Sequence, residues 1–193
     1  MQKIGLLGGT FDPIHIGHLL MARAAMETMR LDRVIFIPSC VPPHKKVPTL
    51  FSAKDRLQMA RLATKGNPQF EVSDFEIRKG GKSYSVETVR YFRQKGQPAD
   101  QLFFIVGGDA IKQIDSWKDI GQLKKMCSFV SVNRPGYPRG ETEQKYHAVT
   151  MNGIEMSSTE IRKRILQKKS IQYLVPDAVL EYIRKNRLYK IEA

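Results

Sequence analysis

Short apolar runs alternate with segments of helical periodicity along this sequence. Buried or half-buried strands are predicted over residues 4–7, 33–37, 70–77, 102–106, 128–132 and 149–151. Helices are predicted over residues 17–29, 52–65, 85–95, 157–167 and 177–185. Strands separated by helices form βαβ units. The pattern therefore predicts an α/β fold: a Rossmann-like, doubly wound, mainly parallel sheet with helices on both faces and a small C-terminal helical portion.

Loops that follow the predicted strands carry most of the glycine-rich and polar sequence. They cover residues 8–18, 38–48, 107–117 and 134–136. In sheets of this kind, ligands bind at the carboxyl ends of the strands, near the point where strand order reverses. We therefore expect these loops to gather at one edge of the sheet and to form a single site. A further polar loop is expected over residues 137–148.

The chain has 193 residues, of which 41% are hydrophobic. This size and composition predict one domain over residues 1–193, with its C-terminal helical portion at about 157–193. No apolar run approaches the roughly 18 residues that a membrane span needs, and the first strand leaves no room for a signal peptide. Cys40 and Cys127 form no disulfide framework, so reduced thiols in a cytoplasmic protein are expected.

The formal net charge of +13 favours anionic partners, either nucleic acid or phosphorylated small molecules. Much of the excess lies in the predicted C-terminal helices, where a solvated face explains it most simply. No basic stretch is interleaved with aromatic residues that could stack on bases. The charge alone therefore selects no function, and no nucleic-acid partner is expected.

The most informative segment is the loop of residues 8–18, which reads Gly-Gly-Thr-Phe-Asp-Pro-Ile-His-Ile-Gly-His. Its glycines let a phosphate chain approach the backbone, and the helix that follows presents an N-terminus to anions. His15 and His18 can donate to charge that develops at phosphorus. Neither Gly-x-x-x-x-Gly-Lys-Ser/Thr nor Gly-x-Gly-x-x-Gly is present. No cysteine or carboxylate cluster accompanies the histidines, so no protein-bound metal is expected.

A second candidate segment lies at the start of the penultimate predicted helix. Ser157 or Ser158 can cap this helix, and Glu160 lies near the capping-box position. Beside a nucleotide loop, the same amides and hydroxyls, with Thr159, can bind the β- and γ-phosphates of ATP. Arg162 can bind them through two N–H groups.

The string His15-Ile16-Gly17-His18 resembles the nucleotidyltransferase signature shared with class I aminoacyl-tRNA synthetases. There, the motif holds the ATP phosphates during attack on the α-phosphorus. The resemblance implies catalytic roles for both histidines, and it implies that Gly17 keeps a side chain out of the phosphate space. Further ATP contacts are implied for Gly8, Gly9, Thr10 and Phe11, the last two beneath the nucleotide.

Taken together, the motifs resemble the bacterial nicotinate-nucleotide adenylyltransferase family over nearly the whole chain. The family-like features, in order, are Gly8-Gly9-Thr10-Phe11-Asp12-Pro13, His15, Gly17-His18, Pro42-Pro43-His44-Lys45, Ser83-Tyr84-Ser85, Glu87-Thr88, Gly107, Asp109, Trp117, Arg134-Pro135-Gly136, Ser157-Ser158-Thr159 and Ile161-Arg162. The family usually has Thr-x-Asp-Thr where this chain has Ser-Val-Glu-Thr. These changes keep a hydroxyl and a carboxylate but leave the role of Glu87 open.

This resemblance implies adenylyl transfer from ATP to nicotinate mononucleotide, with release of pyrophosphate. Trp117 would stack on the pyridine ring. The N-terminus of the helix at Ser85 and Thr88 would bind the nicotinate carboxylate, favouring the acid over the amide. Phosphate contacts are implied for Lys45 and Arg134.

On the ATP side, the resemblance implies that Gly107 leaves room for adenosine and that Asp109 accepts from a ribose hydroxyl. A phosphate monoester has a second pKa of about 6, so the nucleophile is already ionised at neutral pH. The reaction therefore needs no general base. Mg²⁺ is expected to arrive with ATP and to have few protein ligands.

Several alternatives stay open at this point. Another small adenylyltransferase would use phosphopantetheine or nicotinamide mononucleotide as acceptor, and a basic nucleic-acid-binding module is a more distant reading. A synthetase fragment is disfavoured because the second synthetase signature has only a faint counterpart at residues 124–128, in a predicted helix that runs into a strand. The sequence does not determine the oligomeric state, and a homodimer is one arrangement that it allows.

Overall fold

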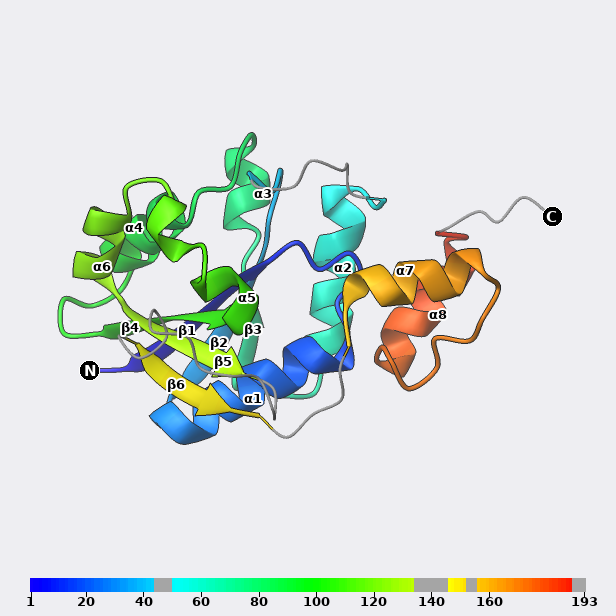
Figure 1. The fold of residues 1–193 in the computed structure, drawn as a ribbon, viewed down its shortest axis with the longest axis horizontal. Coiled ribbons are helices and arrows are strands. Elements are labelled where there is room, and N and C mark those ends of the chain that lie inside the picture. The colour runs from blue at the N-terminus through cyan, green and yellow to red at the C-terminus, as the bar shows by residue number, and fades with distance from the viewer. Residues whose placement is uncertain (44–49, 134–145, 152–155, 189–193) are drawn as a thin grey trace.

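The computed structural model describes residues 1–43, 50–133, 146–151 and 156–188. Its centre is a sheet of six parallel strands in the order β3-β2-β1-β4-β5-β6. The order reverses between β1 and β4, which confirms the predicted doubly wound arrangement (Figure 1). The strands are β1 (Lys3–Gly9), β2 (Arg33–Pro38), β3 (Phe70–Val72), β4 (Gln101–Gly107), β5 (Ser128–Asn133) and β6 (His147–Thr150).

Helices connect the strands and cover both faces of the sheet (Figure 1). Those that the structure describes are α1 (Ile16–Met29), α2 (Ala53–Thr64), α3 (Phe75–Lys79), α4 (Ser85–Lys95), α5 (Gly108–Ile111), α6 (Ile120–Met126), α7 (Ser158–Leu166) and α8 (Asp177–Lys185), with a short 3-10 turn at Ile114–Ser116. The predicted helices are thus confirmed, with bounds that shift by a residue or two.

Alternation along the strands divides the core into two layers. Leu7 of β1 joins the cluster that includes Ala22 of α1 and Met59 of α2. Its neighbour Leu6 belongs to the opposite cluster, with Val89 of α4. A strand buried on both faces reads as a continuous apolar run, which is why the segments at β1, β2, β4 and β5 are recognisable in the sequence.

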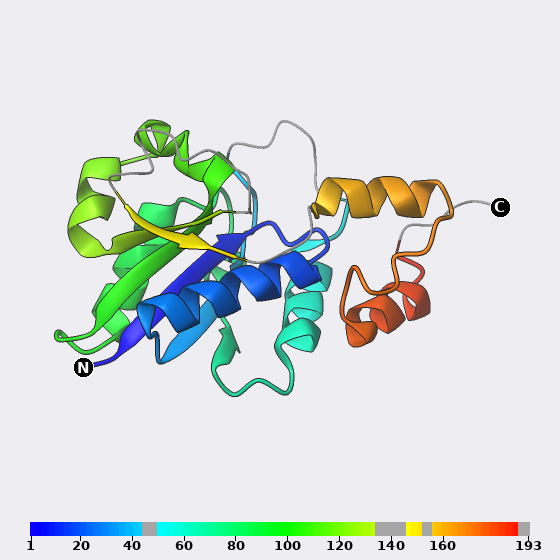
Figure 2. The ribbon, with the colours of Figure 1, turned by 60° about the horizontal axis from the view of Figure 1, so that its bottom comes forward.

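The C-terminal helices extend the α1–α2 side of the molecule (Figure 2). Ile161 of α7 and Val179 of α8 belong to the same buried cluster as α1 and α2. Tyr182 of α8 donates its hydroxyl to Asp55 Oδ1 of α2 at 3.0 Å. This portion of the chain therefore shares its core with the sheet.

One predicted strand is wrong over most of its length. Only Phe70–Val72 of the range 70–77 forms a strand, and Phe75–Lys79 is helical. Ser73 Oγ accepts the Phe75 N–H at 3.2 Å, which ends the strand and begins the turn. The Phe75 ring then stacks on Tyr91 of α4, with centroids 3.9 Å apart.

The last strand also differs from its prediction. β6 begins at His147, inside the predicted polar loop of residues 137–148, and most of that loop lies outside the described residues. The two cysteines are free thiols. Burial raises the pKa of Cys127 to about 12, as expected for an unreactive core thiol. No helix in the described part of the chain has the length and apolar character needed to cross a membrane.

Candidate active site

A cavity of about 370 Å³ opens where the carboxyl ends of the central strands meet. The loops that follow three strands form its wall, as the sequence predicts, while residues 134–136 lie outside the described residues. These wall residues include Gly8, Gly9 and Thr10 at or after the end of β1, Ser39, Pro42 and Pro43 after β2, and Gly107, Ala110 and Trp117 at or after the end of β4. The cavity therefore occupies the ligand position of a doubly wound sheet.

The two motif histidines have different surroundings. His18 lines the cavity, whereas His15 is 5% exposed and lies behind it as the N-cap of α1. The two imidazole rings stack with centroids 3.7 Å apart. The His15 backbone N–H donates to His18 Nδ1 at 3.2 Å. Because Nδ1 is the acceptor, neutral His18 carries its proton on Nε2.

Gly17 and Phe11 serve the packing around these rings rather than the cavity wall. A Cβ atom on Gly17 would lie 3.0 Å from His15 Nδ1, so a side chain there would have to displace that imidazole slightly. Phe11 is 1% exposed in the core and contacts His18 edge-on, with centroids 4.9 Å apart. The structure thus places Phe11 behind His18, not in the wall expected to lie beneath the nucleotide.

Of the two glycines that end β1, Gly9 allows close packing, whereas Gly8 has only an ordinary contact distance. A Cβ on Gly9 would lie 2.7 Å from the Phe11 ring, while one on Gly8 would lie 3.4 Å from Phe104. Gly9 therefore holds the loop against Phe11, and both glycines leave their backbone in the cavity wall.

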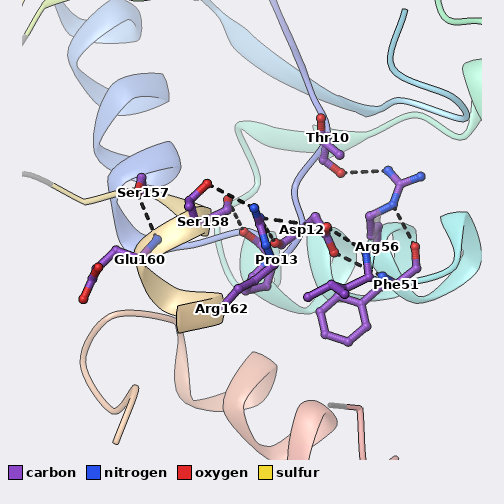
Figure 3. Close-up of polar contacts among 11 residues, drawn as sticks. Thr10, Asp12, Pro13, Phe51, Arg56, Ser157, Ser158, Glu160 and Arg162 are labelled. Carbon is purple, nitrogen blue, oxygen red and sulfur yellow. Dashed lines mark hydrogen bonds and ion pairs between the residues drawn. The ribbon is translucent and has the colours of Figure 1, made fainter. Parts of the chain in front are cut away.

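The N-terminus of α7 docks on the loop after β1, although nearly the whole chain separates them (Figure 3). Ser158 Oγ donates to Pro13 O at 2.9 Å, and Arg162 Nη1 donates to Asp12 O at 2.9 Å. Arg162 Nη2 donates to Thr159 Oγ1, and Ser157 Oγ caps the helix by accepting from Glu160 N. The two candidate segments of the sequence are therefore neighbours, although the four α7 residues lie outside the cavity wall as described.

Sequence reasoning missed a buried arginine that organises these loops. Arg56 is 0% exposed, and its guanidinium donates to the carbonyls of Thr10 at 2.7 Å and Phe51 at 3.4 Å (Figure 3). It also donates to the carbonyls of Ser39 at 2.7 Å and Cys40 at 2.9 Å. Burial lowers the pKa of Arg56, with the nearby Asp12 carboxylate opposing that effect. The signal was available: Arg56 lies on the same helical face as Met59 and Ala60, which the fold buries.

At the end of the cavity formed by α4, aromatic and polar groups meet. Ser83, Tyr84 and Ser85 line it, together with Trp117 and Lys118. The Trp117 indole packs edge-on against Phe104, with centroids 5.9 Å apart. The structure thus brings two predicted substrate contacts, Ser85 and Trp117, into one wall.

Thr88 does not line this wall but supports a residue that does. Its hydroxyl donates to Glu76 Oε1 at 2.6 Å, and Glu76 is a wall residue that is 5% exposed. Burial raises the pKa of the Glu76 carboxyl, while hydrogen bonds from Thr88 and Ser83 oppose the rise. Glu76 went unrecognised in the sequence because it falls within the segment predicted as a strand.

Ser39 is a second unrecognised wall residue. It is 7% exposed, and its hydroxyl has no hydrogen-bond partner among the described residues. Its oxygen atom is itself buried. Lys45 and Arg134 lie outside the described residues, and so does the side chain of Asp109. No group of three or more potential metal-ligating side chains occurs among the described residues.

Residues 6–164 match the cytidylyltransferase-like family model, so the chain belongs to this class of proteins. The chain belongs, within that class, to the nicotinate-nucleotide adenylyltransferase family. It is 45% identical to the probable nicotinate-nucleotide adenylyltransferase of Moorella thermoacetica, and the match covers 97% of this chain and 92% of that relative. Identity to the Thermus thermophilus relative of the same name is 44%, over 98% of this chain and 100% of that relative.

Solved structures share the fold at lower identity. The Plasmodium falciparum nicotinic acid mononucleotide adenylyltransferase complexed with NaAD has a TM-score of 0.81 and 18% identity, covering 100% of this chain and 99% of that one. A putative nicotinate-nucleotide adenylyltransferase from Vibrio parahaemolyticus has a TM-score of 0.71, covering 99% and 97% respectively. The likeness extends over the full length of the fold.

Proposed function

We propose that this chain transfers the adenylyl group of ATP to nicotinate mononucleotide, giving nicotinate adenine dinucleotide and pyrophosphate for NAD biosynthesis. The observation that carries the proposal is one cavity whose wall holds His18 and the β1 glycines together with Trp117 and Ser85. Family membership supports it, because the relatives at 40–45% identity are named for this activity. The acceptor phosphate attacks the α-phosphorus of ATP, and pyrophosphate leaves.

His18 stabilises charge in this scheme. Its Nε2–H donates to a phosphate oxygen as negative charge moves towards the departing pyrophosphate. The His15 N–H fixes the tautomer required for this donation, and stacking on His15 fixes the ring. The acceptor phosphate is already ionised at neutral pH, so the site needs positioning more than proton abstraction. Gly8, Gly9 and Thr10 supply backbone at the ATP side of the cavity.

The N-terminus of α7 supplies the second half of the ATP site in this proposal. Ser157, Ser158, Thr159 and Arg162 bind the β- and γ-phosphates, for which a helix N-terminus with an arginine is well suited. In support, Ser158 and Arg162 already fix this helix to the loop after β1. Binding of ATP would then exchange the Arg162–Thr159 contact for phosphate contacts.

The remaining assignments belong to the same proposal. Gly107 makes room for adenosine, Asp109 binds ribose, and Lys45 and Arg134 bind phosphate. ATP enters as its divalent metal complex, with Mg²⁺ as the proposed ion. The whole chain acts as one nucleotidyltransferase domain, in keeping with the core that α7 and α8 share with the sheet. A homodimer, the lack of a nucleic-acid partner and a cytoplasmic location stay predictions.

A direct test offers the purified chain ATP and magnesium with each of three acceptors: nicotinate mononucleotide, nicotinamide mononucleotide and phosphopantetheine. Pyrophosphate release gives the rate, and mass spectrometry identifies the product. We expect nicotinate adenine dinucleotide to form fastest, and no turnover after chelation of the metal. Faster transfer to phosphopantetheine, or no transfer to any acceptor, would contradict the proposed function.

A further inference from the structure

Lys118 occupies an unusual position at the rim of the cavity. It follows Trp117 directly, and its side chain is 48% exposed. The ammonium lies over the Tyr84 ring at 4.3 Å from the centroid and 3.5 Å from Glu87 Oε1. Tyr84 is the N-cap of α4, and Glu87 lies in its first turn. Lys118 therefore spans the gap between the Trp117 loop and the helix proposed to meet the nicotinate carboxylate.

The charges around this rim leave a cation available. Glu87 Oε2 also pairs with Lys79 at the shorter distance of 3.0 Å. Two lysines thus share one carboxylate, and the cluster carries a net charge of +1 when all three groups are ionised. Partial burial opposes ionisation of Glu87, but its contacts with the two ammonium groups outweigh burial and hold its pKa below the usual value. If Lys118 moves away from Glu87, that carboxylate stays paired with Lys79.

The other residues of the cavity wall offer little positive charge that would favour an acid over an amide. Among the wall residues that the structure describes, Lys118 supplies the only ammonium or guanidinium group, and Glu76 supplies a carboxyl group. Backbone N–H groups at the start of α4 can donate to the oxygen of a carboxylate or of a carboxamide. A hydrogen bond from an ammonium group is substantially stronger to a carboxylate than to a carboxamide, because both partners are then charged.

We propose that Lys118 is the specificity-determining residue that reads the acceptor's carboxylate, exchanging Glu87 for the substrate when the pyridine ring stacks on Trp117. This inference rests on the proposed function and assigns its choice between acid and amide to one side chain. It also gives Glu87 a role: its carboxylate holds Lys118 at the rim before substrate arrives and then stays paired with Lys79.

The experiment measures kcat/KM for nicotinate mononucleotide and for nicotinamide mononucleotide, and takes their ratio as the readout. Lys118→Met removes the charge and keeps most of the length of the side chain. Lys118→Arg keeps the charge. Lys124→Met is the matched control, because Lys124 also pairs with an exposed carboxylate, that of Asp115, but neither lines the cavity nor contacts Glu87. Thermal melting verifies that each variant is folded.

We expect Lys118→Met to lower the acid-to-amide ratio by about tenfold, with the loss on the acid substrate. Lys118→Arg should keep the ratio within about threefold, and Lys124→Met should leave it at the wild-type value. An unchanged ratio in Lys118→Met would overturn the proposal. Equal losses for both acceptors, or the same fall in Lys124→Met, would also overturn it, by indicating a phosphate contact or a diffuse charge effect. Failure of the proposed function is distinguishable, because the wild-type chain would then not convert nicotinate mononucleotide.

Discussion

The two ends of the cavity are built in different ways. At the β1 end, Arg56, Asp12 and Phe11 are almost fully buried and tie the loop to its neighbours through backbone carbonyls, backbone amides and ring packing. At the α4 end, Trp117 and Lys118 are partly or fully exposed and are held by ring contacts and ion pairs. In the proposed function, reaction geometry would thus be fixed by the core, whereas acceptor recognition would depend on side chains nearer the surface.

This difference predicts which property, stability, turnover or substrate binding, a substitution at each end should change. Buried polar groups are costly to leave without partners, so changes at the β1 end should affect stability or turnover. Exposed ion pairs contribute little to folding, so changes at the α4 end should affect substrate binding in a folded protein. Each prediction below tests one side of that division.

The largest effect is expected from Arg56→Met. The substitution leaves the buried or part-buried carbonyls of Thr10, Ser39 and Cys40 without this donor. It also removes a cation that Asp12 faces, although Asp12 keeps its 3.9 Å pair with Arg162. We expect the free energy of unfolding to fall by about 3–5 kcal/mol, measured by urea denaturation. Arg23→Met is the control, because that exposed ion pair with Glu27 should change stability by less than about 0.5 kcal/mol. Similar effects of the two substitutions would remove the contrast.

Next in size is His18→Ala. Loss of an Nε2–H donor at the reacting phosphates should lower kcat by about 10²–10³-fold while the protein stays folded. Steady-state kinetics and circular dichroism measure the two quantities. The control is His147→Ala, an exposed histidine on β6, which should retain wild-type kcat. Normal kcat in His18→Ala would exclude that imidazole from catalysis.

Trp117→Ala should have a smaller and more selective effect. Loss of the stacking surface should raise KM for nicotinate mononucleotide by about tenfold, in line with the roughly 1–3 kcal/mol that base stacking contributes. KM for ATP should change little. Phe92→Ala, a partly buried aromatic of the same core layer outside the cavity wall, controls for loss of packing. A rise in KM for ATP alone would contradict the stacking role.

The smallest effect concerns pH. Burial raises the pKa of Glu76 above its usual value of 4.5, so the folded protein retains that proton after the unfolded chain has lost it. Stability contributed at this site should therefore decrease as pH rises above about 4.5, by at most about 1.4 kcal/mol per pH unit. Glu76→Gln removes the titration. Urea denaturation across pH should show wild-type stability falling relative to the variant, and a relative rise would contradict the assignment.

Much of the fold could be predicted because its central strands are buried on both faces and read as apolar runs. The site loops could be located because they follow those strands. What the sequence did not reveal depends on tertiary contacts. Phe75 begins a helix instead of continuing the strand, and its ring stacks on Tyr91 of α4. Phe11, placed beneath the nucleotide by resemblance, is drawn into the core beside His18.

The candidate site shows the same limit. His18, Gly8, Gly9, Thr10, Ser85, Gly107 and Trp117 line the cavity as expected. Thr88 supports the site through its hydrogen bond to Glu76, and Arg56 supports it through hydrogen bonds to four carbonyls. Such roles depend on which buried groups face one another across the fold. Spacing along the chain does not encode this information.

The central claim is that the acceptor and ATP react across one cavity, with His18 at the phosphates and Trp117 at the pyridine. A crystal structure with bound nicotinate adenine dinucleotide tests it most directly. We predict His18 Nε2 within hydrogen-bond distance of a bridging or α-phosphate oxygen, and the pyridine stacked on the Trp117 indole. A product molecule that binds elsewhere, or one whose phosphates lie away from His18, would contradict the account.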